Sequence, residues 1–450
     1  MKPYVLVAAL IILSCWTLWC RYREGRLFTP SSGLHLQFLV FFGMGGFGFA
    51  LFPNAEPHLS KLEIIESILQ CIPPLLGGYA IAIGIERFYF RRKRRIETVM
   101  TRGGTFSPVV IFFVALLGFA GCLLEGELLI PGLSSLPTYC KNLFFPCFLL
   151  AIINARSYGI HGILVSVLIV IMAIVIGIWS PWRSVLIILA ATILLAVILM
   201  RPKWIPVTLV AGVIAMGLLI PFQNAKKIGY EEFVADPYLL VEQTLDMKMG
   251  ERWEGVGDFV AKRINYVREL VYVNRALQAG MPLENGETYL QIFYQLVPRF
   301  LWQDKPEIQE RAGFFLPREV GLLQKVDVST SWAVNSSAEA TYNFGLKSLI
   351  WFIPVMFLLA EGMEKIMRRI TLTPQAGVLG NISLFYLYLG HTSAIFAASM
   401  IVALIVIIKG VDLALVYTGV SSRQDIKTGL RRAVSNLPGT KQTAYRIRGS

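Results

Sequence analysis

Long apolar stretches alternate with short polar connections along most of the chain. A helix needs roughly 20 apolar residues to cross the hydrocarbon core of a bilayer, which is about 30 Å thick. The pattern therefore predicts an all-α polytopic membrane protein with about eleven transmembrane helices. The predicted spans lie near residues 4–20, 33–52, 64–90, 107–124, 142–155, 160–178, 184–200, 205–221, 346–362, 376–390 and 394–416.

One long segment, residues 222–345, interrupts the apolar pattern. It mixes aromatic and aliphatic residues with charge and has no Ser/Gly-rich run, which is typical of a folded module rather than a linker. Within it we expect helices at 230–248 and 256–280, an interfacial helix at 288–302, and mostly loop at 303–337. The predicted organisation is a bundle of about eight spans at 1–221, the module at 222–345, transmembrane helices at 346–416 and a basic tail at 417–450.

The charges explain the orientation of this pattern. Hydrophobic residues make up 55% of the chain and charged residues 16%, and the net charge of +13 is distributed in short clusters between apolar stretches. Such clusters do not form a nucleic-acid-binding stripe, so no nucleic acid is expected as a partner. Taking every second loop as cytoplasmic collects the cations on one side, which places the N-terminus and the module outside and the C-terminus inside. The collected groups are Arg21, Arg23 and Arg26, residues 91–95, Arg156, Arg201 and Lys203, Lys365, Arg368 and Arg369, and the tail.

Two further observations concern the first apolar stretch and the cysteines. Arg21 and Arg23 follow the first apolar stretch where a cleavable signal would have small residues, so this stretch is interpreted as the first span. The six cysteines lie in or beside apolar stretches without metal-binding spacing and are interpreted as packing residues. A disulfide between Cys122 and Cys140 is the alternative.

The predicted helix at 256–280 has an apolar side and a polar side. Asn265 and Glu269 fall on the polar side, whereas Arg263 and Asn274 fall near the middle of the apolar side. A buried charge needs a partner. Arg263 therefore either pairs with a structural carboxylate or carbonyl group, or points into a polar cavity and holds an anion, for which a guanidinium offers forked donors.

Two prolines bracket a cationic turn. Pro298 and Pro306 restrict the backbone around Arg299 and Lys305, and Trp302 can anchor the turn at the membrane surface. These cations either hold a phosphate group or simply extend to the interface from an anchor.

The residues at 329–345 are small, hydroxylated or amide-bearing and suit sugar hydroxyls or a diphosphate. Glu339 is a candidate general base. If residues 335–345 begin the helix that enters the membrane, Asn335, Glu339 and Tyr342 share one face. The alternative is that these residues only cap and pack the following helix. Weaker candidates are Arg311 and Arg318 as phosphate ligands and His391 at the outer end of a span, each with a structural or solvated role as the alternative.

These motifs carry a resemblance. The pattern Pro-Arg-x-x-Trp-x-x-Lys-Pro at 298–306, followed by Glu-x-x-Tyr-Asn-Phe-Gly at 339–345 before a span, resembles the oligosaccharide repeat-unit polymerases of the Wzy type, with Gln303 where proline is frequent. The resemblance covers roughly 255–350. It implies O-antigen or exopolysaccharide assembly at the bacterial inner membrane, a GT-C-like glycosyltransferase architecture, and a substrate site with Arg263, Arg299, Lys305 and Glu339.

The resemblance implies an undecaprenyl-diphosphate-linked oligosaccharide as substrate, and a chain-length regulator as a possible protein partner. Arg263, Arg299 and Lys305 would neutralise the departing diphosphate, and Glu339, or Asp304 as the alternative, would take the hydroxyl proton. No metal or other cofactor is expected. An O-antigen ligase remains a rival within the same class. A flippase or transporter, the rival from another class, would place ionisable residues inside the spans, whereas most charges here lie in predicted loops.

Overall fold

The described part of the protein is helical. The computed structural model describes residues 3–51, 59–90, 107–124, 136–155, 159–179, 188–189, 192–197, 202–204, 207–208, 265–296, 302, 304, 316–323, 334–390 and 394–417. Across these residues the chain forms helices and turns without a β-strand. The all-α class is therefore confirmed for this part of the chain.

Several helices are long and apolar enough to cross a membrane, so the protein is a multi-pass membrane protein. By length and composition there are six among the described residues, at Pro3–Arg23, Pro30–Ala50, Lys61–Phe88, Gly159–Ile176, Leu346–Ile370 and Met400–Tyr417. Each coincides with a predicted span. The total of eleven stays a prediction. The stretches at 184–200 and 205–221 lie largely outside the described residues, and the helices described at 107–124, 142–155 and 376–390 have fewer than 18 residues each.

The N-terminal part of the bundle contains ordinary and π-helical segments. It comprises α1 (Pro3–Arg23), α2 (Pro30–Gln37), the π-helix η1 (Phe38–Met44), α3 (Gly45–Leu51), α4 (Lys61–Ile85), the π-helix η3 (Glu86–Phe90), α5 (Pro108–Leu124), α6 (Leu136–Lys141), α7 (Phe144–Asn154), α8 (Gly159–Trp179) and the short 3₁₀ helix η4 (Pro202–Trp204). Helix α7 has 11 residues. At 1.5 Å per residue it is about 17 Å long, too short to cross a bilayer unaided.

The C-terminal part holds the described portion of the 222–345 segment and three long helices. Its elements are α14 (Tyr266–Gln278), α15 (Glu287–Leu296), α16 (Leu316–Glu319), α17 (Ser336–Phe344), the 3₁₀ helix η6 (Leu346–Ser348), α18 (Leu349–Ile370), α19 (Pro374–Gly390) and α20 (Ala394–Tyr417). The predicted helix at 256–280 is described only from its middle onward, and the predicted interfacial helix at 288–302 corresponds to α15.

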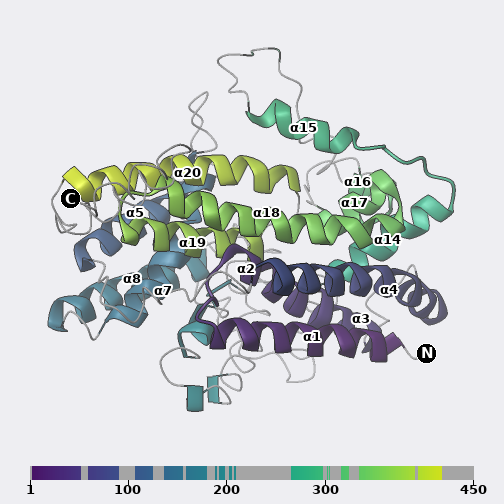
Figure 1. The fold of residues 1–450 in the computed structure, drawn as a ribbon, viewed down its shortest axis with the longest axis horizontal. Coiled ribbons are helices and arrows are strands. Elements are labelled where there is room, and N and C mark those ends of the chain that lie inside the picture. The colour runs from purple at the N-terminus through teal and green to yellow at the C-terminus, as the bar shows by residue number, and fades with distance from the viewer. Residues whose placement is uncertain are drawn as a thin grey trace, which may run out of the picture.

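The long helices lie roughly along one axis of the molecule (Figure 1). Helix α1 begins at the right of the view, where α14, α16 and α17 gather, and α20 ends at the left. We call the right end the module end, and the region further to the left, where α1 and α18 finish, the arginine end. Helices α4 and α18 pack closely, because Gly78 lies against the carbonyl group of Leu349, where any Cβ would collide.

Local capping explains where two of the bundle helices start. Helix α4 begins with a capping box, in which Ser60 accepts from the Glu63 amide and Glu63 accepts from the Ser60 amide. Helix α2 begins with Thr29 as its N-cap and Pro30 at its first position. These caps therefore satisfy some of the backbone amides that a helix start leaves without a partner inside the helix.

Aromatic side chains connect the bundle to the module. In the bundle, the rings of Phe38 and Tyr79 stack with centroids 4.4 Å apart. Further along the same span, Phe41 stacks on Tyr266 of α14, also at 4.4 Å. The module has a small apolar core of its own, made by Tyr272, Val273, Leu316, Val320, Leu322, Val334, Ala338 and Tyr342. Helix α14 is therefore held between the bundle on one side and α17 on the other.

Candidate functional site

Four of the residues predicted to form the site are described, and all four lie in the module. Asn335, Glu339 and Tyr342 belong to α17 or its cap, and Arg318 lies on the short helix α16. The other predicted site residues, Arg263, Arg299, Lys305, Arg311 and His391, lie outside the described residues. The alternative base Asp304 is described and is exposed at a turn.

Asn335 fixes the start of α17. Its side-chain oxygen accepts from the amides of Ser337 and Ala338 at 3.0 Å each, which satisfies two helix-end donors. Its own amide and its side-chain NH₂ both donate to the carboxylate of Glu269, at 2.6 and 2.7 Å. Glu269 is 3% exposed. A carboxylate held by two donors from one residue fixes the position of that residue, so Glu269 anchors the helix that carries Glu339.

Glu339 is buried and is held by a directed chain of hydrogen bonds. The Asn343 side-chain oxygen accepts from the Gly286 amide at 2.9 Å, which fixes the orientation of the Asn343 amide group. The Asn343 NH₂ group then donates to the Thr288 hydroxyl at 2.7 Å. Because that hydroxyl oxygen is accepting, its own hydrogen is available, and it donates to Oε1 of Glu339 at 3.1 Å. This series of hydrogen bonds ends on Oε1 of Glu339, and that oxygen carries no proton because it accepts from Thr288.

We call Glu269, Thr288, Asn335, Glu339 and Asn343 the Glu339 cluster. Its members come from α14, α15 and α17, and each has a side chain with less than a tenth of its surface exposed. The hydrogen bonds to Glu269 and Glu339 described above come from neutral groups. Such donors stabilise and orient an ionised carboxylate, so the cluster holds two positioned carboxylates at the module end of the bundle.

Tyr342 projects from the other end of α17. Its hydroxyl donates to Glu284 at 2.9 Å and lies 3.5 Å from Glu319. Burial raises the pKa of Tyr342 above its ordinary value, and the hydrogen bond and charge of Glu284 raise the pKa further. The phenol therefore stays protonated in neutral solution and donates its single hydrogen mainly to Glu284, with Glu319 as the more distant acceptor.

Tyr289 is a residue of this region that the sequence patterns did not single out. Its ring stacks on Phe344 with the centroids 5.8 Å apart, and its hydroxyl is buried without a hydrogen-bond partner in the structure. Burial, and then the charge of Glu339, raise the pKa of Tyr289 well above its ordinary value. A buried and unpaired hydroxyl beside a carboxylate is costly for folding alone, and is the kind of group that a sugar hydroxyl could satisfy.

The polar side predicted for the helix at 256–280 is buried where the structure describes it, because Asn265 and Glu269 pack against α17. The condition set for residues 335–345 is not met: they do not begin the helix that enters the membrane, because Gly345 interrupts the helix with a φ of 78° between α17 and η6. Asn274, expected to need a partner, has one in Gln70 at 3.1 Å.

A second buried polar cluster lies at the arginine end. Arg21 and Arg26 follow one another around the end of α1, Glu86 begins η3, and Glu361 and Glu364 lie one turn apart on α18. All five are less than a tenth exposed. We call these five residues the arginine–glutamate network.

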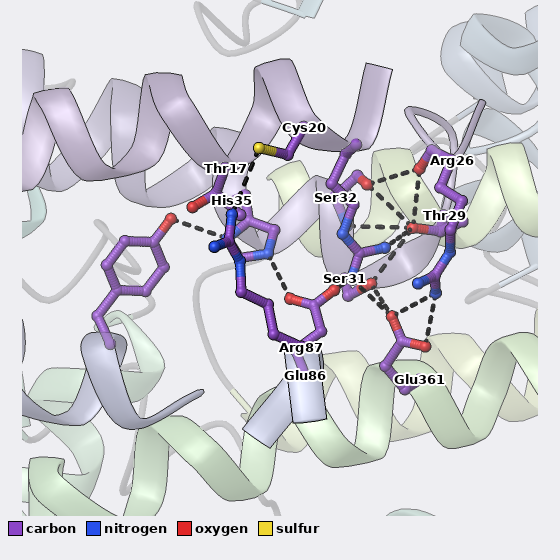
Figure 2. A network of polar contacts seen from close by, with 12 residues as sticks. Thr17, Cys20, Arg26, Thr29, Ser31, Ser32, His35, Glu86, Arg87 and Glu361 are labelled. Atoms are coloured by element: carbon purple, nitrogen blue, oxygen red, sulfur yellow. Dashed lines mark hydrogen bonds and ion pairs between the residues drawn. The ribbon is translucent and has the colours of Figure 1, made fainter. Parts of the chain in front are cut away.

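Every carboxylate of this network has an arginine partner. Glu361 lies 2.8 Å from both Arg21 and Arg26, and also accepts from Ser31. Figure 2 shows Arg26, Thr29 and Ser31 converging on this side of Glu361. The remaining partners are Arg21 for Glu86, and Arg26 and Arg368 for Glu364. The network therefore ties α1, α4 and α18 together with nearly balanced charge.

A histidine extends the network toward the bundle interior. Glu86 accepts from Nε2 of His35 at 2.8 Å, and Nδ1 of His35 lies 2.8 Å from the hydroxyl of Tyr79. Because a carboxylate paired with Arg21 only accepts, Nε2 carries the proton and Nδ1 accepts from Tyr79. His35 is therefore neutral and bridges α2 to α4.

The network shows how two arginines of the first basic cluster are held. Arg21 and Arg26, assigned to a cytoplasmic loop by the charge pattern, are 3% and 9% exposed and paired, and their side of the membrane stays a prediction. Only Arg23 of that cluster is exposed. A signal was present in the sequence, since Glu361 and Glu364 interrupt an apolar stretch at the i, i+3 spacing that places both on one helix face.

Neither a metal centre nor a disulfide is found among the described residues. No group of three or more His, Cys, Asp and Glu side chains there could hold a metal ion. The six cysteines are free thiols, so the alternative of a Cys122–Cys140 disulfide is wrong. Cys71, Cys140 and Cys147 are buried in the bundle, as expected of packing residues.

Comparisons with known proteins give no match: no protein-family model, no curated protein and no solved structure matches this chain. The functional argument therefore rests on the residues themselves.

Proposed function

We propose that this chain is a polysaccharide polymerase, which transfers a growing undecaprenyl-diphosphate-linked glycan onto an incoming lipid-linked repeat unit. The observation that carries the proposal is Glu339, which is 1% exposed and is held by Thr288 through an unprotonated oxygen. It lies on α17, directly before the span that begins at Leu346. A positioned carboxylate at the end of a transmembrane bundle suits a reaction between two lipid-anchored substrates.

The reaction assigns a task to this carboxylate. A hydroxyl oxygen of the incoming repeat unit attacks the anomeric carbon at the reducing end of the growing chain, and a new glycosidic bond forms. The bond from that carbon to the diphosphate breaks, and undecaprenyl diphosphate leaves with the bonding electrons. Glu339 accepts the hydroxyl proton, a contribution on the order of 10²–10⁴-fold in rate.

The leaving group needs positive charge. Arg263, Arg299 and Lys305 are proposed to bind the diphosphate, with Arg311, Arg318 and His391 at greater distance along the same substrate. Arg318 lies on α16, next to Glu319, whose carboxylate approaches the Tyr342 hydroxyl. Asn335 and Tyr342, on the same helix as Glu339 or at its cap, are proposed to bind the sugar or diphosphate beside these cations. The unpaired hydroxyl of Tyr289 is suited to a sugar hydroxyl.

One observation favours a second candidate. Buried ionisable residues within spans are typical of transport proteins, and the arginine–glutamate network with His35 is such a group. A flippase or transporter of lipid-linked oligosaccharide is therefore the rival function. The near-balance of charge in the network favours the polymerase, because a transport site that binds an ion or a proton needs a group left unpaired in one of its states.

The decisive experiment examines the glycan made without the protein. A strain lacking a polymerase accumulates a single lipid-linked repeat unit on the outer side of the inner membrane, and the wild-type chain restores a ladder of lengths. A transporter deletion leaves the repeat unit on the cytoplasmic side. A ligase deletion leaves long lipid-linked chains that fail to reach lipid A core. Each of the latter two results contradicts the proposal.

Glu339→Gln sharpens the assignment within the same strain. It keeps the volume and the hydrogen bond from Thr288 but cannot accept a proton, so polymer yield should fall on the order of 10²–10⁴-fold. Binding of the lipid-linked substrate and the melting temperature should stay close to wild type. Glu287→Gln, an exposed acid at the start of α15, is the matched control. Normal polymer yield from Glu339→Gln would exclude the base role, and a collapsed melting temperature would make Glu339 structural.

The same proposal places the module outside the cytoplasm. In a cysteine-free background, Ser329→Cys should react with an impermeant thiol reagent in cells whose outer membrane is permeabilised. If labelling requires a broken inner membrane, the orientation is inverted and lipid-linked repeat units on the outer leaflet cannot reach the site.

A further inference from the structure

The lipid-facing side of α1 changes character toward the arginine end. Val5 and Ile12 are 49% and 68% exposed, and Trp16 and Trp19 are 44% and 56% exposed. At 100° per residue these four positions and Arg23 fall within about one sixth of a turn on α1. The helix therefore presents one continuous stripe that is aliphatic, then aromatic, then cationic.

Two arginines lie over the aromatic part of this stripe. The guanidinium of Arg87, from η3, is 3.6 Å from the centroid of the Trp16 ring, and that of Arg23 is 5.6 Å from the Trp19 ring. Arg87 also donates to the Cys20 sulfur at 3.4 Å. Stacking on an indole face restricts a guanidinium to one plane without neutralising it.

These two arginines differ from their buried neighbours. Arg21 and Arg26 are paired with carboxylates of the arginine–glutamate network. Among the residues that the structure describes, neither Arg23 nor Arg87 lies within ion-pairing distance of a carboxylate. Their charge is thus available to an outside anion.

A small hollow lies beside the stripe, between α1 and the end of α4. It is lined by Thr17, Cys20, Arg21, Glu24, Glu86 and Arg87 among others, and Figure 2 shows Arg87 directed toward Cys20 at this place. Glu86 is already paired with Arg21 and His35. Glu24 is the exposed acid at this rim, and its charge opposes an anion there.

We propose that Arg23 and Arg87, on their tryptophan platforms, bind the phosphate group of an anionic phospholipid in the leaflet at the arginine end. The aliphatic part of the stripe favours a lipid over free phosphate, because an acyl chain can lie along Ile12 and Val5. From Arg23 to Ile12 the helix rises about 17 Å, close to the depth of one leaflet's hydrocarbon region. Tryptophan is also the residue that membrane proteins place at headgroup depth.

The test compares lipids on the purified full-length protein in a neutral detergent. Native mass spectrometry during titration gives the apparent affinity for phosphatidylglycerol and for phosphatidylcholine. Phosphatidylglycerol should bind more tightly. Arg87→Gln and Arg23→Gln should each weaken it about fivefold, and the double variant about 25-fold, as expected for one surface cation each. Glu24→Gln should tighten it by a few fold.

Matched controls decide whether the effect is local. Arg369→Gln removes an exposed cation at the end of α18, at the same end of the bundle but without a tryptophan beneath it, and should leave the affinity unchanged. If it weakens binding as much as Arg87→Gln does, only diffuse charge attracts the lipid and the proposed site does not exist. Equal affinity for the two lipids, or displacement by millimolar inorganic phosphate, would also overturn it.

One variant keeps the charge in place. Trp16→Leu retains Arg87 and the apolar surface but removes the platform, and should weaken binding about two- to fivefold. This variant stands in for Arg87→Gln if the latter does not fold. Unchanged binding by Trp16→Leu would contradict the proposal.

Discussion

The two buried polar clusters of this protein hold their carboxylates in different ways. In the arginine–glutamate network every glutamate meets a guanidinium, and Glu361 meets two. In the Glu339 cluster the hydrogen bonds described above to Glu269 and Glu339 come from an amide group, a backbone amide and a hydroxyl group. Ion pairs are suited to joining helices, whereas directed donors set the orientation of a carboxylate. The comparison motivates assigning Glu361 to structure and proposing Glu339 as the reactive acid.

The largest expected effect comes from the network. Glu361→Gln removes the carboxylate that Arg21 and Arg26 share and leaves only Glu86 and Glu364 beside them. Removing one partner of a buried ion pair costs about 3–5 kcal/mol of stability, and the remaining carboxylates should keep the loss near the lower value. The melting temperature of the purified protein should drop sharply, and polymer yield should fall with the amount of folded protein. Glu24→Gln, an exposed acid at the same end, should change stability by less than about 0.5 kcal/mol. Equal melting temperatures for Glu361→Gln and wild type would remove the structural role of the network.

A smaller effect should separate reactivity from stability in the other cluster. Thr288→Val keeps the shape but removes the hydroxyl that orients Oε1 of Glu339, so turnover should fall roughly tenfold, corresponding to the loss of about one hydrogen bond. Thr341→Val is the control, because its hydroxyl is equally buried but donates to the Ser337 carbonyl within α17. Both variants should lose about 1 kcal/mol of stability. The prediction fails if the two variants lose activity equally.

The smallest effect concerns Tyr342 and appears only at high pH. Its pKa is raised in the folded protein, so above the ordinary tyrosine pKa of about 10 the folded state holds a proton that the unfolded state has released. The stability that this proton contributes is fully present below pH 10 and declines as pH rises beyond it. Tyr342→Phe should therefore lose less stability than wild type between pH 8 and pH 10.5. Tyr417 is 85% exposed, so Tyr417→Phe should behave as wild type. Thermal unfolding of the three proteins at pH 8 and pH 10.5 measures the difference.

Features that depend on neighbouring residues in the sequence could be predicted, whereas contacts between distant residues could not. Apolar runs predicted the positions of the six candidate spans, because crossing a bilayer needs length and apolarity within one segment. The motif around Glu339 also drew attention to α17. The burial of Arg21 could not be predicted in this way, because its partner Glu361 is 340 positions away in the chain. A basic residue after an apolar run has the same local pattern whether it meets water or a distant acid.

The same reasoning explains the outcome for Glu269. Helical periodicity placed it on a polar side, which is correct as far as α14 alone is concerned. Whether a polar side meets solvent depends on what packs against it, and α17 supplies Asn335 there. Periodicity identifies the faces of a helix but not the neighbour of each face.

The break at Gly345 has a consequence for where the proposed reaction takes place relative to the bilayer. If α17 continued straight into α18, Glu339 would stand about 15 Å above Leu349 along a single rod. Instead the chain turns back at Gly345, and the Ala340 carbonyl accepts from the Ser348 hydroxyl at 3.1 Å. A substrate tethered by an isoprenoid tail holds its diphosphate at the membrane surface and cannot rise to meet a distant carboxylate. In the proposed reaction, the break at Gly345 would keep the carboxylate within reach of a lipid-anchored substrate.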